Sequence, residues 1–217
     1  MKLISFIKQQ SRGFTMIELV VSISIMVMMT GFLLFNYPES AIKVTLSNSV
    51  QSIALLLREA QVRGSAVDSI DSSVGGYGVY IKLSSTDTQS SVKFFADSVD
   101  VSGDISSFGL PIGNGLYEKS PIDETSSVTL LPVGYKITKF CVGQSASCHT
   151  ANDDSLTISF TRPNPQPDIY LNGLKTTNFS RACIEVQSPG ESDLPGHIRS
   201  IEIYNSGMIS TKISPCS

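Results

Sequence analysis

The chain has 217 residues, of which 41% are hydrophobic and 16% are charged. This length fits one domain of ordinary size with an additional element, and the charged fraction lies below the roughly 25% of an average globular protein. Residues 68–217 hold 10 Lys and Arg against 16 Asp and Glu. Their acidic balance argues against a nucleic-acid-binding surface, which needs clustered cations to neutralise phosphates.

The N-terminal region combines a basic leader with a long apolar run. Residues 1–13 carry three basic side chains and no acid, whereas residues 14–35 contain a single charge, Glu18. As a helix the apolar run would be about 33 Å long at about 1.5 Å per residue, which matches a bilayer core of about 30 Å. The pattern predicts a membrane-spanning helix with the leader in the cytoplasm and the rest of the chain outside.

Two simpler interpretations of this region remain open. A secretory signal peptide has an apolar region of about 7–15 residues followed by small residues at a cleavage site. Here the run is longer, carries an acid near its start and ends in FNYP at residues 35–38, without an Ala-x-Ala pattern. The other interpretation is a signal anchor that undergoes no processing.

A short motif at the start of the apolar run reads RGFTMIEL, residues 12–19. It resembles the prepilin cleavage and methylation signature of type IV pilins and type II secretion pseudopilins. The resemblance covers about 20 residues, and Met16 stands where the family commonly has Leu. It implies that a membrane aspartic peptidase, the prepilin peptidase, cuts between Gly13 and Phe14 and methylates the new amine of Phe14.

An acid inside an apolar helix needs an explanation, because insertion of a charge costs roughly 2.5–3.5 kcal/mol. Glu18 would be the fifth residue of the processed chain. The resemblance implies that Glu18 pairs with the Phe14 amine of a neighbouring assembled subunit, which would relieve the buried charge and fix the axial step between subunits. The alternative is a Glu that reaches the lipid headgroups from near the helix start.

We expect the helix to continue beyond the membrane segment. Pro38 predicts a kink, because proline removes a backbone donor and clashes with the preceding turn; the alternative is a break, with a new helix starting after it. Gly64 is a candidate stop. Between these positions apolar residues recur at intervals of three and four, which predicts a helix face packed on a sheet of the same chain: Leu46, Val50, Ile53, Leu57 and Ala60.

The remainder of the chain predicts strands. Asn205-Ser206-Gly207 is a tight-turn sequence, so the last two strands should form a hairpin, and residues 98–126 predict a long surface excursion. The expected strands are Gly78–Leu83, Val92–Ala96, Ser127–Leu131, Tyr135–Val142, Leu156–Thr161, Asp168–Leu171, Ala182–Gln187, Ile198–Tyr204 and Met208–Ile213.

The resemblance implies an α+β, pilin-like fold, in which a long N-terminal helix packs its second half on an antiparallel β-sheet domain. The expected divisions are a removed leader (1–13), a transmembrane and assembly helix (14–37), an amphipathic continuation (38–66) and an extracytoplasmic β-rich domain (67–217). Looser features resemble the H-type minor pseudopilins, the GspH/FimT-like group: LLLREAQ near the helix end, a GYGVY strand and the closing hairpin IEIYNSG. A major pilin remains the alternative.

All four cysteines lie in the C-terminal half, as expected of an extracytoplasmic domain, and four cysteines allow three pairings. Cys141 and Cys148 bracket a short flexible loop, and Cys216 would tie down the C-terminus at Cys183. We therefore favour Cys141–Cys148 with Cys183–Cys216. A metal site involving His149 beside Cys148 is the rival interpretation, but no Cys-x-x-Cys and no paired His spacing supports it.

The sequence indicates no catalytic residue, no cofactor and no metal. His149 and His197 could each join a Ser and an Asp, but no Gly-x-Ser-x-Gly elbow or phosphate-binding loop positions such a set. Asp153-Asp154, and Asp100 with Asp104, lack a calcium-loop pattern and are typical of solvated acidic turns.

The function that the resemblance implies is structural, a minor subunit of a type IV pilus or type II secretion pseudopilus. Its expected partners are other pilin or pseudopilin subunits, the prepilin peptidase, an inner-membrane assembly platform, and membrane lipid before assembly. The expected location is the bacterial inner membrane, crossed once, with later assembly into a filament. The alternatives are a DNA-binding minor pilin of an uptake system and a signal-anchored extracytoplasmic protein, including an anchored enzyme.

Overall fold

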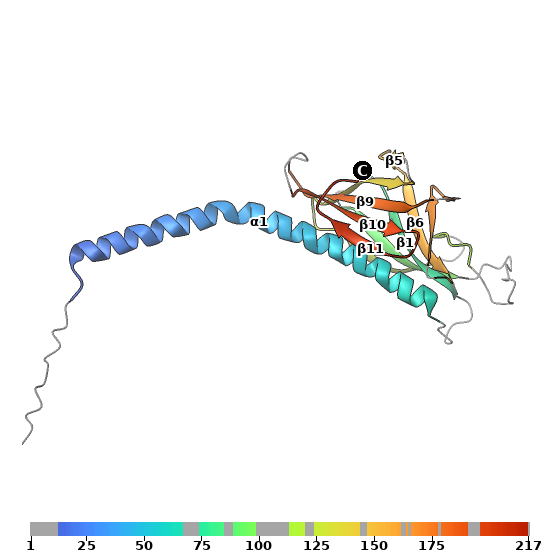
Figure 1. Cartoon of the computed structure of the whole chain (residues 1–217), viewed down its shortest axis with the longest axis horizontal. Helices are drawn as coiled ribbons and strands as arrows, with labels where there is room; N and C mark the ends of the chain where they lie inside the picture. Colours follow the sequence, from blue (N-terminus) through green and yellow to red (C-terminus); the bar gives the residue numbers. More distant parts are fainter. Residues whose placement is uncertain are drawn as a thin grey trace, which may run out of the picture. The chain divides into compact units, whose positions relative to one another are not determined.

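The structure is a computed structural model that describes residues 13–66, 74–84, 89–98, 113–119, 124–143, 147–161, 164, 166–177, 179–190 and 196–216. The chain forms two compact units, Met1–Ala41 and Ile42–Ser217. One helix, α1 (Met16–Ser65), begins in the first unit and ends in the second (Figure 1). Its helical backbone runs through residue 38, so the break considered as an alternative is absent at that position. A kink at Pro38 stays a prediction.

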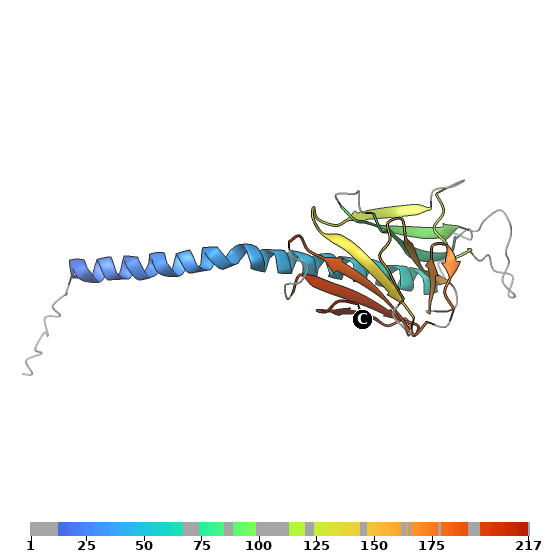
Figure 2. The ribbon, with the colours of Figure 1, turned by 90° about the horizontal axis from the view of Figure 1, so that it is seen from above.

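The described strands of the second unit form two antiparallel sheets. The six-stranded sheet has the order β3-β2-β1-β6-β7-β8, and the five-stranded sheet the order β11-β10-β9-β4-β5. Figures 1 and 2 both show the last part of α1 running beside these strands. The strands are β1 Val74–Lys82, β2 Ser91–Ser98, β3 Thr125–Leu130, β4 Lys136–Val142, β5 Ser147–His149, β6 Ser155–Thr161, β7 Pro167–Leu171, β8 Leu174–Lys175, β9 Arg181–Gln187, β10 Ile198–Tyr204 and β11 Ile209–Lys212.

A single hydrophobic core joins the second part of α1 to both sheets. The predicted helix face is buried, since the exposed fraction of Leu46, Val50, Ile53, Leu57 and Ala60 is at most 1%. These side chains belong to one cluster with residues of the first sheet, such as those on β1 and β6, and of the second, such as those on β9 and β10. The α+β fold with a helix on antiparallel sheets is confirmed, and burial of this stripe holds the helix in place.

The helix end differs from the expectation for Gly64. The helix continues to Ser65, so Gly64 lies inside the last turn and is not the stop. A Cβ atom at Gly64 would overlap the carbonyl oxygen and Cβ of Phe160 on β6. Gly64 therefore allows close approach of helix and sheet, which is a packing role.

Each predicted strand overlaps an observed one, but some bounds differ: Leu83, Leu131, Met208 and Ile213 were predicted as strand residues and lie outside β1, β3 and β11. Tyr135 lies in a turn, with its N–H donating to the carbonyl of Pro132 at 3.0 Å, and β4 begins one residue later. The short strands β5 and β8 were not predicted. Within the predicted excursion, residues 99–112 and 120–123 lie outside the described residues, and Gly113 and Gly115 are buried, so at these two positions the expectation of a surface segment is wrong.

The C-terminal hairpin is confirmed. β10 and β11 pair antiparallel, with Ile203 opposite Ile209. In the connecting turn the N–H of Gly207 donates to the carbonyl of Tyr204 at 2.9 Å. Gly207 has a φ of 82°, a backbone conformation that glycine adopts without strain.

Two disulfides join the cysteines as favoured from the sequence, Cys141 to Cys148 and Cys183 to Cys216. Residues of both bonds lie outside the main core, in a separate small cluster of buried residues. In the chain-entropy treatment, bonds that close 7 and 33 residues stabilise the fold by about 2 and about 4 kcal/mol. The longer closure fixes the end of the chain to β9.

Candidate processing and assembly site

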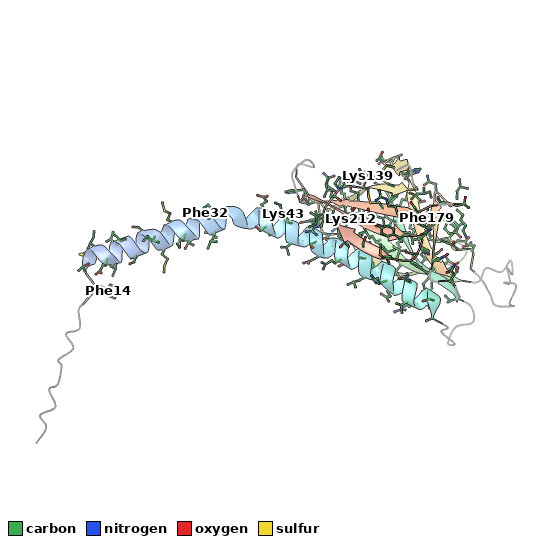
Figure 3. The ribbon with its side chains drawn as sticks, in the orientation of Figure 1. Phe14, Phe32, Lys43, Lys139, Phe179 and Lys212 are labelled. Carbon is green, nitrogen blue, oxygen red and sulfur yellow. A yellow bond between two sulfur atoms is a disulfide. The ribbon has the colours of Figure 1, made fainter. Side chains whose placement is uncertain are left out.

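The predicted cleavage site lies at an exposed end of α1. Gly13 precedes the helix and Phe14 is 86% exposed; Figure 3 shows the Phe14 side chain at the start of the helix. A Cβ atom at Gly13 would meet no atom within 4 Å. The packing of the described residues therefore does not require glycine at this position. Arg12 and the rest of the leader lie outside the described residues.

Glu18 and Thr15 together form the N-terminal cap of α1. The backbone N–H and the hydroxyl of Thr15 both donate to Oε2 of Glu18, each at 2.9 Å. The N–H of Glu18 donates in return to the Thr15 hydroxyl at 3.3 Å. Such a reciprocal pair satisfies helix donors that have no partner within the helix, and an acid in the first turn also suits the helix dipole.

This cap was missed in the sequence analysis, although its signal is present. Thr15-Met16-Ile17-Glu18 has the spacing of a capping box, a Ser or Thr followed three residues later by Glu, just before an apolar run. The cap leaves the carboxylate with one uncommitted oxygen: among the described residues, no hydrogen bond reaches Oε1 of Glu18. The acid can therefore start its own helix and still accept a second donor.

The helix segment that follows is mainly apolar and exposed. The segment Met16–Leu34 is long and apolar enough to cross a membrane, and none of it is buried against the rest of the described chain. Its 19 residues span about 28 Å at about 1.5 Å each. Large exposed side chains such as Phe32, labelled in Figure 3, occur along the whole segment. A helix of this kind is suited to lipid or to packing among other helices.

The hydroxyl groups in this segment are satisfied internally. Ser22, Ser24 and Thr30 each donate a hydrogen bond to the carbonyl four residues earlier, at 2.7–2.8 Å. Such bonds spare a hydroxyl from needing water, which matters in an apolar surrounding, where an unsatisfied polar group is costly. The polar residues of the span therefore remain compatible with a membrane.

The residues considered for catalysis or metal binding have partners within the protein. Asp153 forms an ion pair with Lys82 at 3.0 Å. Asp154 accepts a hydrogen bond from Asn172 at 2.9 Å and lies 3.6 Å from His149. Asp100 and Asp104 lie outside the described residues. Within the part of the chain that the structure describes, no group of three acidic, His or Cys side chains could hold a metal ion.

His197 has a partner that sequence reasoning did not find. Its Nδ1 lies 2.8 Å from the hydroxyl of Ser188, and the backbone groups of the two residues are also hydrogen-bonded. Ser188 is 3% exposed and His197 is 5% exposed. The contact joins the residue that follows β9 to the residue that precedes β10.

A second buried polar site connects β2 to the segment Gly113–Lys119. The N–H of Gly115 donates to Oδ2 of Asp97 at 2.8 Å, and the hydroxyl of Tyr170 donates to the carbonyl of Asn114 at 3.0 Å. Asp97 is fully buried, and its Oδ1 has no hydrogen-bond partner among the described residues. Burial raises the pKa of Asp97 to about 7.

These observations define a single-pass, membrane-anchored protein with an accessible site just before its membrane helix. Residues 8–34 match the family model described as the prokaryotic N-terminal methylation motif. The motif spans Gly13, Phe14 and Glu18, and the chain therefore has the N-terminal signature of the type IV pilin and pseudopilin family. No curated protein and no solved structure matches the chain.

Proposed function

We propose that this chain is a minor subunit of a type IV pilus or a type II secretion pseudopilus. The observation that carries the proposal is the arrangement at the start of α1. An exposed Gly13-Phe14 bond is followed at once by a capped, mainly apolar helix segment, Met16–Leu34, in which the one acid, Glu18, has a carboxylate oxygen without a hydrogen bond from the described residues. An accessible bond suits removal of a leader, and an apolar helix with one acid suits storage in lipid followed by helix packing.

The proposed sequence of events starts with insertion into the bacterial inner membrane, with residues 1–13 in the cytoplasm. A prepilin peptidase removes the leader and methylates the amine of Phe14. The apolar segment of α1 then stays in lipid until an inner-membrane assembly platform passes the subunit to the filament. There the segment exchanges lipid contacts for contacts with the helices of other pilin or pseudopilin subunits.

In this mechanism the two oxygens of Glu18 have different roles. Oε2 accepts both hydrogen bonds from Thr15 and so belongs to the helix cap. Oε1 is available for the Phe14 amine of a neighbouring subunit. A charge-assisted hydrogen bond of this kind is stronger inside an apolar filament than in water. The pair would satisfy two charges that otherwise oppose burial.

The structure gives less support to the alternative of a DNA-binding pilin. Phosphate recognition needs cations that are available to the ligand. On the described β strands several cations already contact carboxylates: Lys82, Lys139, Lys175, Arg181 and Lys212 each lie within 3.1 Å of an acid. We therefore expect weak DNA binding by the purified chain, without the steep salt dependence of multiple phosphate contacts.

The first test is the N-terminus of the protein purified from membranes of its native host, determined by mass spectrometry. We expect a mature chain that begins at N-methylated Phe14. An intact Met1 would instead identify an unprocessed signal anchor. A start beyond Pro38 would identify a secreted domain, and either result would contradict the proposal.

The second test concerns Glu18. The variant Glu18→Ala should be processed normally but should enter filaments about tenfold less efficiently or worse, because the neighbour's amine would lose its partner. Sheared filaments and membranes are compared by immunoblot. The control is Glu59→Ala, which removes an exposed glutamate of the same helix that pairs with Arg63. Normal incorporation of the Glu18 variant would disprove the pairing.

A further inference from the structure

Three of the four cysteines lie in register across β5, β4 and β9 of the second sheet, and the fourth, Cys216, follows the last strand. On β4, Cys141 is the register partner of Cys148 on β5 and also of Cys183 on β9. Cys183 is bonded in turn to Cys216. Phe140 and Val142 belong to the main core, whereas Cys141, Cys183 and Cys216 form a buried cluster of their own. The side chains of Cys141 and Cys183, one from each disulfide, therefore occupy neighbouring positions on the face opposite the core.

We infer that the two disulfides form one thiol–disulfide exchange site, at which a small thiolate becomes bonded to Cys148 and the thiolate of Cys216 is released. This inference is independent of the proposed filament function. Direct register partners on antiparallel strands have Cα atoms about 4.5–5.5 Å apart, within the range that a disulfide can bridge. A bond between Cys141 and Cys183 is therefore possible without a change of strand pairing.

Exposure decides where an external thiolate attacks. Cys148 is exposed, whereas Cys141, Cys183 and Cys216 have exposed fractions of 4%, 2% and 6%. Attack requires contact with a disulfide sulfur, so access limits the rate along with the nucleophilicity of the thiolate. Cys148 is the exposed residue of its disulfide, so we expect attack at its sulfur, with the thiolate of Cys141 as the leaving group.

The exchange is balanced without an oxidant. In the first step the external thiolate bonds to the sulfur of Cys148, and the Cys141–Cys148 bond breaks with its electron pair on Cys141. In the second step the Cys141 thiolate bonds to the sulfur of Cys183, and the electron pair of the Cys183–Cys216 bond passes to Cys216. One thiolate is consumed and one is produced, and two disulfides are present before and after.

The exchange would remove the covalent attachment of β5 and of the C-terminal segment to their neighbouring strands. β5 loses its covalent link to β4, and the C-terminus loses its link to β9. After the exchange, the C-terminal segment would contact β9 through noncovalent interactions, such as the hydrogen bond that the N–H of Cys216 donates to Oε2 of Glu185 at 3.0 Å. Lys139 holds the same carboxylate at 3.1 Å. A reagent that acts at Cys148 would therefore act on the C-terminal segment as well.

The test uses the oxidised full-length chain in detergent, incubated with glutathione, quenched in acid and alkylated before peptide mapping. We expect glutathione on Cys148, a crosslink between Cys141 and Cys183, and an alkylated Cys216. The inference is wrong if Cys141 is the alkylated residue while the Cys183–Cys216 bond persists. It is also wrong if glutathione is found first on Cys216.

Two matched variants test the exchange without an external thiol. Cys148→Ser and Cys216→Ser each leave one internal thiol, and both should settle as the same Cys141–Cys183 crosslink. In the control Cys141→Ser the exchange is blocked, so glutathione should release the Cys216 thiol about tenfold more slowly than in the wild type or slower still. Equal release rates in the control and the wild type would overturn the inference, and this comparison does not depend on the folding of the other two variants.

Discussion

The two parts of α1 are both rich in apolar residues but expose them in opposite ways. In Met16–Leu34 large apolar side chains are exposed along the whole segment, with Met16 and Met28 at 87% and 79%. In the part after Ile42, one stripe is buried almost completely in the core of the second unit. The second part is stabilised by packing within its own chain, whereas no residue of the segment Met16–Leu34 is buried against the rest of the described chain.

The two units of the chain also differ in the exposure and hydrogen bonding of a carboxylate. Glu18 is exposed, and Thr15 supplies both hydrogen bonds to one of its oxygens. Asp97 is fully buried, and one of its oxygens has no partner among the described residues. An exposed acid with a free oxygen can take a partner from another molecule. A buried acid with a free oxygen instead costs stability when it is ionised.

The largest expected effect comes from a truncation on the buried stripe. Leu57→Ala should lower the free energy of unfolding of the second unit by about 2–5 kcal/mol, because it removes transfer energy and leaves a cavity. Urea unfolding of the full-length chain in mild detergent, followed by tyrosine circular dichroism, measures this change.

The matched control is Leu55→Ala on the same helix, since Leu55 is 68% exposed. Leu33→Ala in the first part should also leave this transition unchanged. An equal loss in all three variants would contradict the contrast between the two parts.

The difference between the two parts of α1 could be predicted from the sequence, because the apolar residues of the second part recur with the period of a helix. The stripe from Leu46 to Ala60 repeats every three or four residues, and the strands alternate or form short apolar runs. The Asn205-Ser206-Gly207 turn carries local turn chemistry. These features depend on neighbours in the chain, so the helix, most strands and the closing hairpin could be predicted.

The missed elements fall into two kinds. A signal for β8 was present, because Asn172-Gly173 joins Leu171 to its register partner Leu174 and both turn residues have positive φ, as in a two-residue hairpin. The Thr15–Glu18 cap likewise had a sequence pattern that could have been read. By contrast, the three-residue strand β5 has no periodic signal of its own.

The buried polar contacts could not have been predicted by the same means. The hydrogen bond between Asp97 and Gly115 joins residues that are 18 positions apart in the sequence. Most of the segment between them has no periodic pattern. Gly115 is needed there for its positive φ of 78°, and Gly113 because a Cβ atom would overlap the Asp97 carboxyl group. Such contacts arise from tertiary packing, which one sequence does not reveal. The motif at the start of the apolar segment is different, because its residues lie close together in the chain and can therefore be recognised in the sequence.

The next expected effect is a pH dependence caused by Asp97. Its pKa is about 7 in the folded protein against an ordinary value of 3.8, so the folded state binds the proton more tightly than the unfolded state. The free energy of unfolding should therefore fall as pH rises from about 4 to about 7 and then level off. Asp97→Asn keeps an acceptor for Gly115 and should stabilise the protein at pH 8 by as much as about 4 kcal/mol, at about 1.4 kcal/mol per pKa unit.

Unfolding measured at pH 5 and pH 8 tests this expectation. The wild type should be less stable at pH 8 than at pH 5, and the Asp97→Asn variant should show a smaller difference. Asp168→Asn is the control, because Asp168 is partly exposed and pairs with Lys175 at the surface, where such pairs contribute little. An unchanged pH dependence in the Asp97 variant would show that another group causes it.

The smallest expected effect lies in the first part of α1 and separates the helix cap from the assembly role of Glu18. Thr15→Val removes the hydroxyl of the cap and should destabilise the first turn by about 1 kcal/mol, with faster amide exchange near Glu18 in detergent micelles. Thr15→Ser should restore slow exchange, because serine keeps the hydroxyl. If Glu18 works in assembly through its free oxygen, Thr15→Val should weaken incorporation far less than Glu18→Ala does. Equal defects in the two variants would mean that the cap, and with it the shape of the helix start, is what a neighbouring subunit recognises.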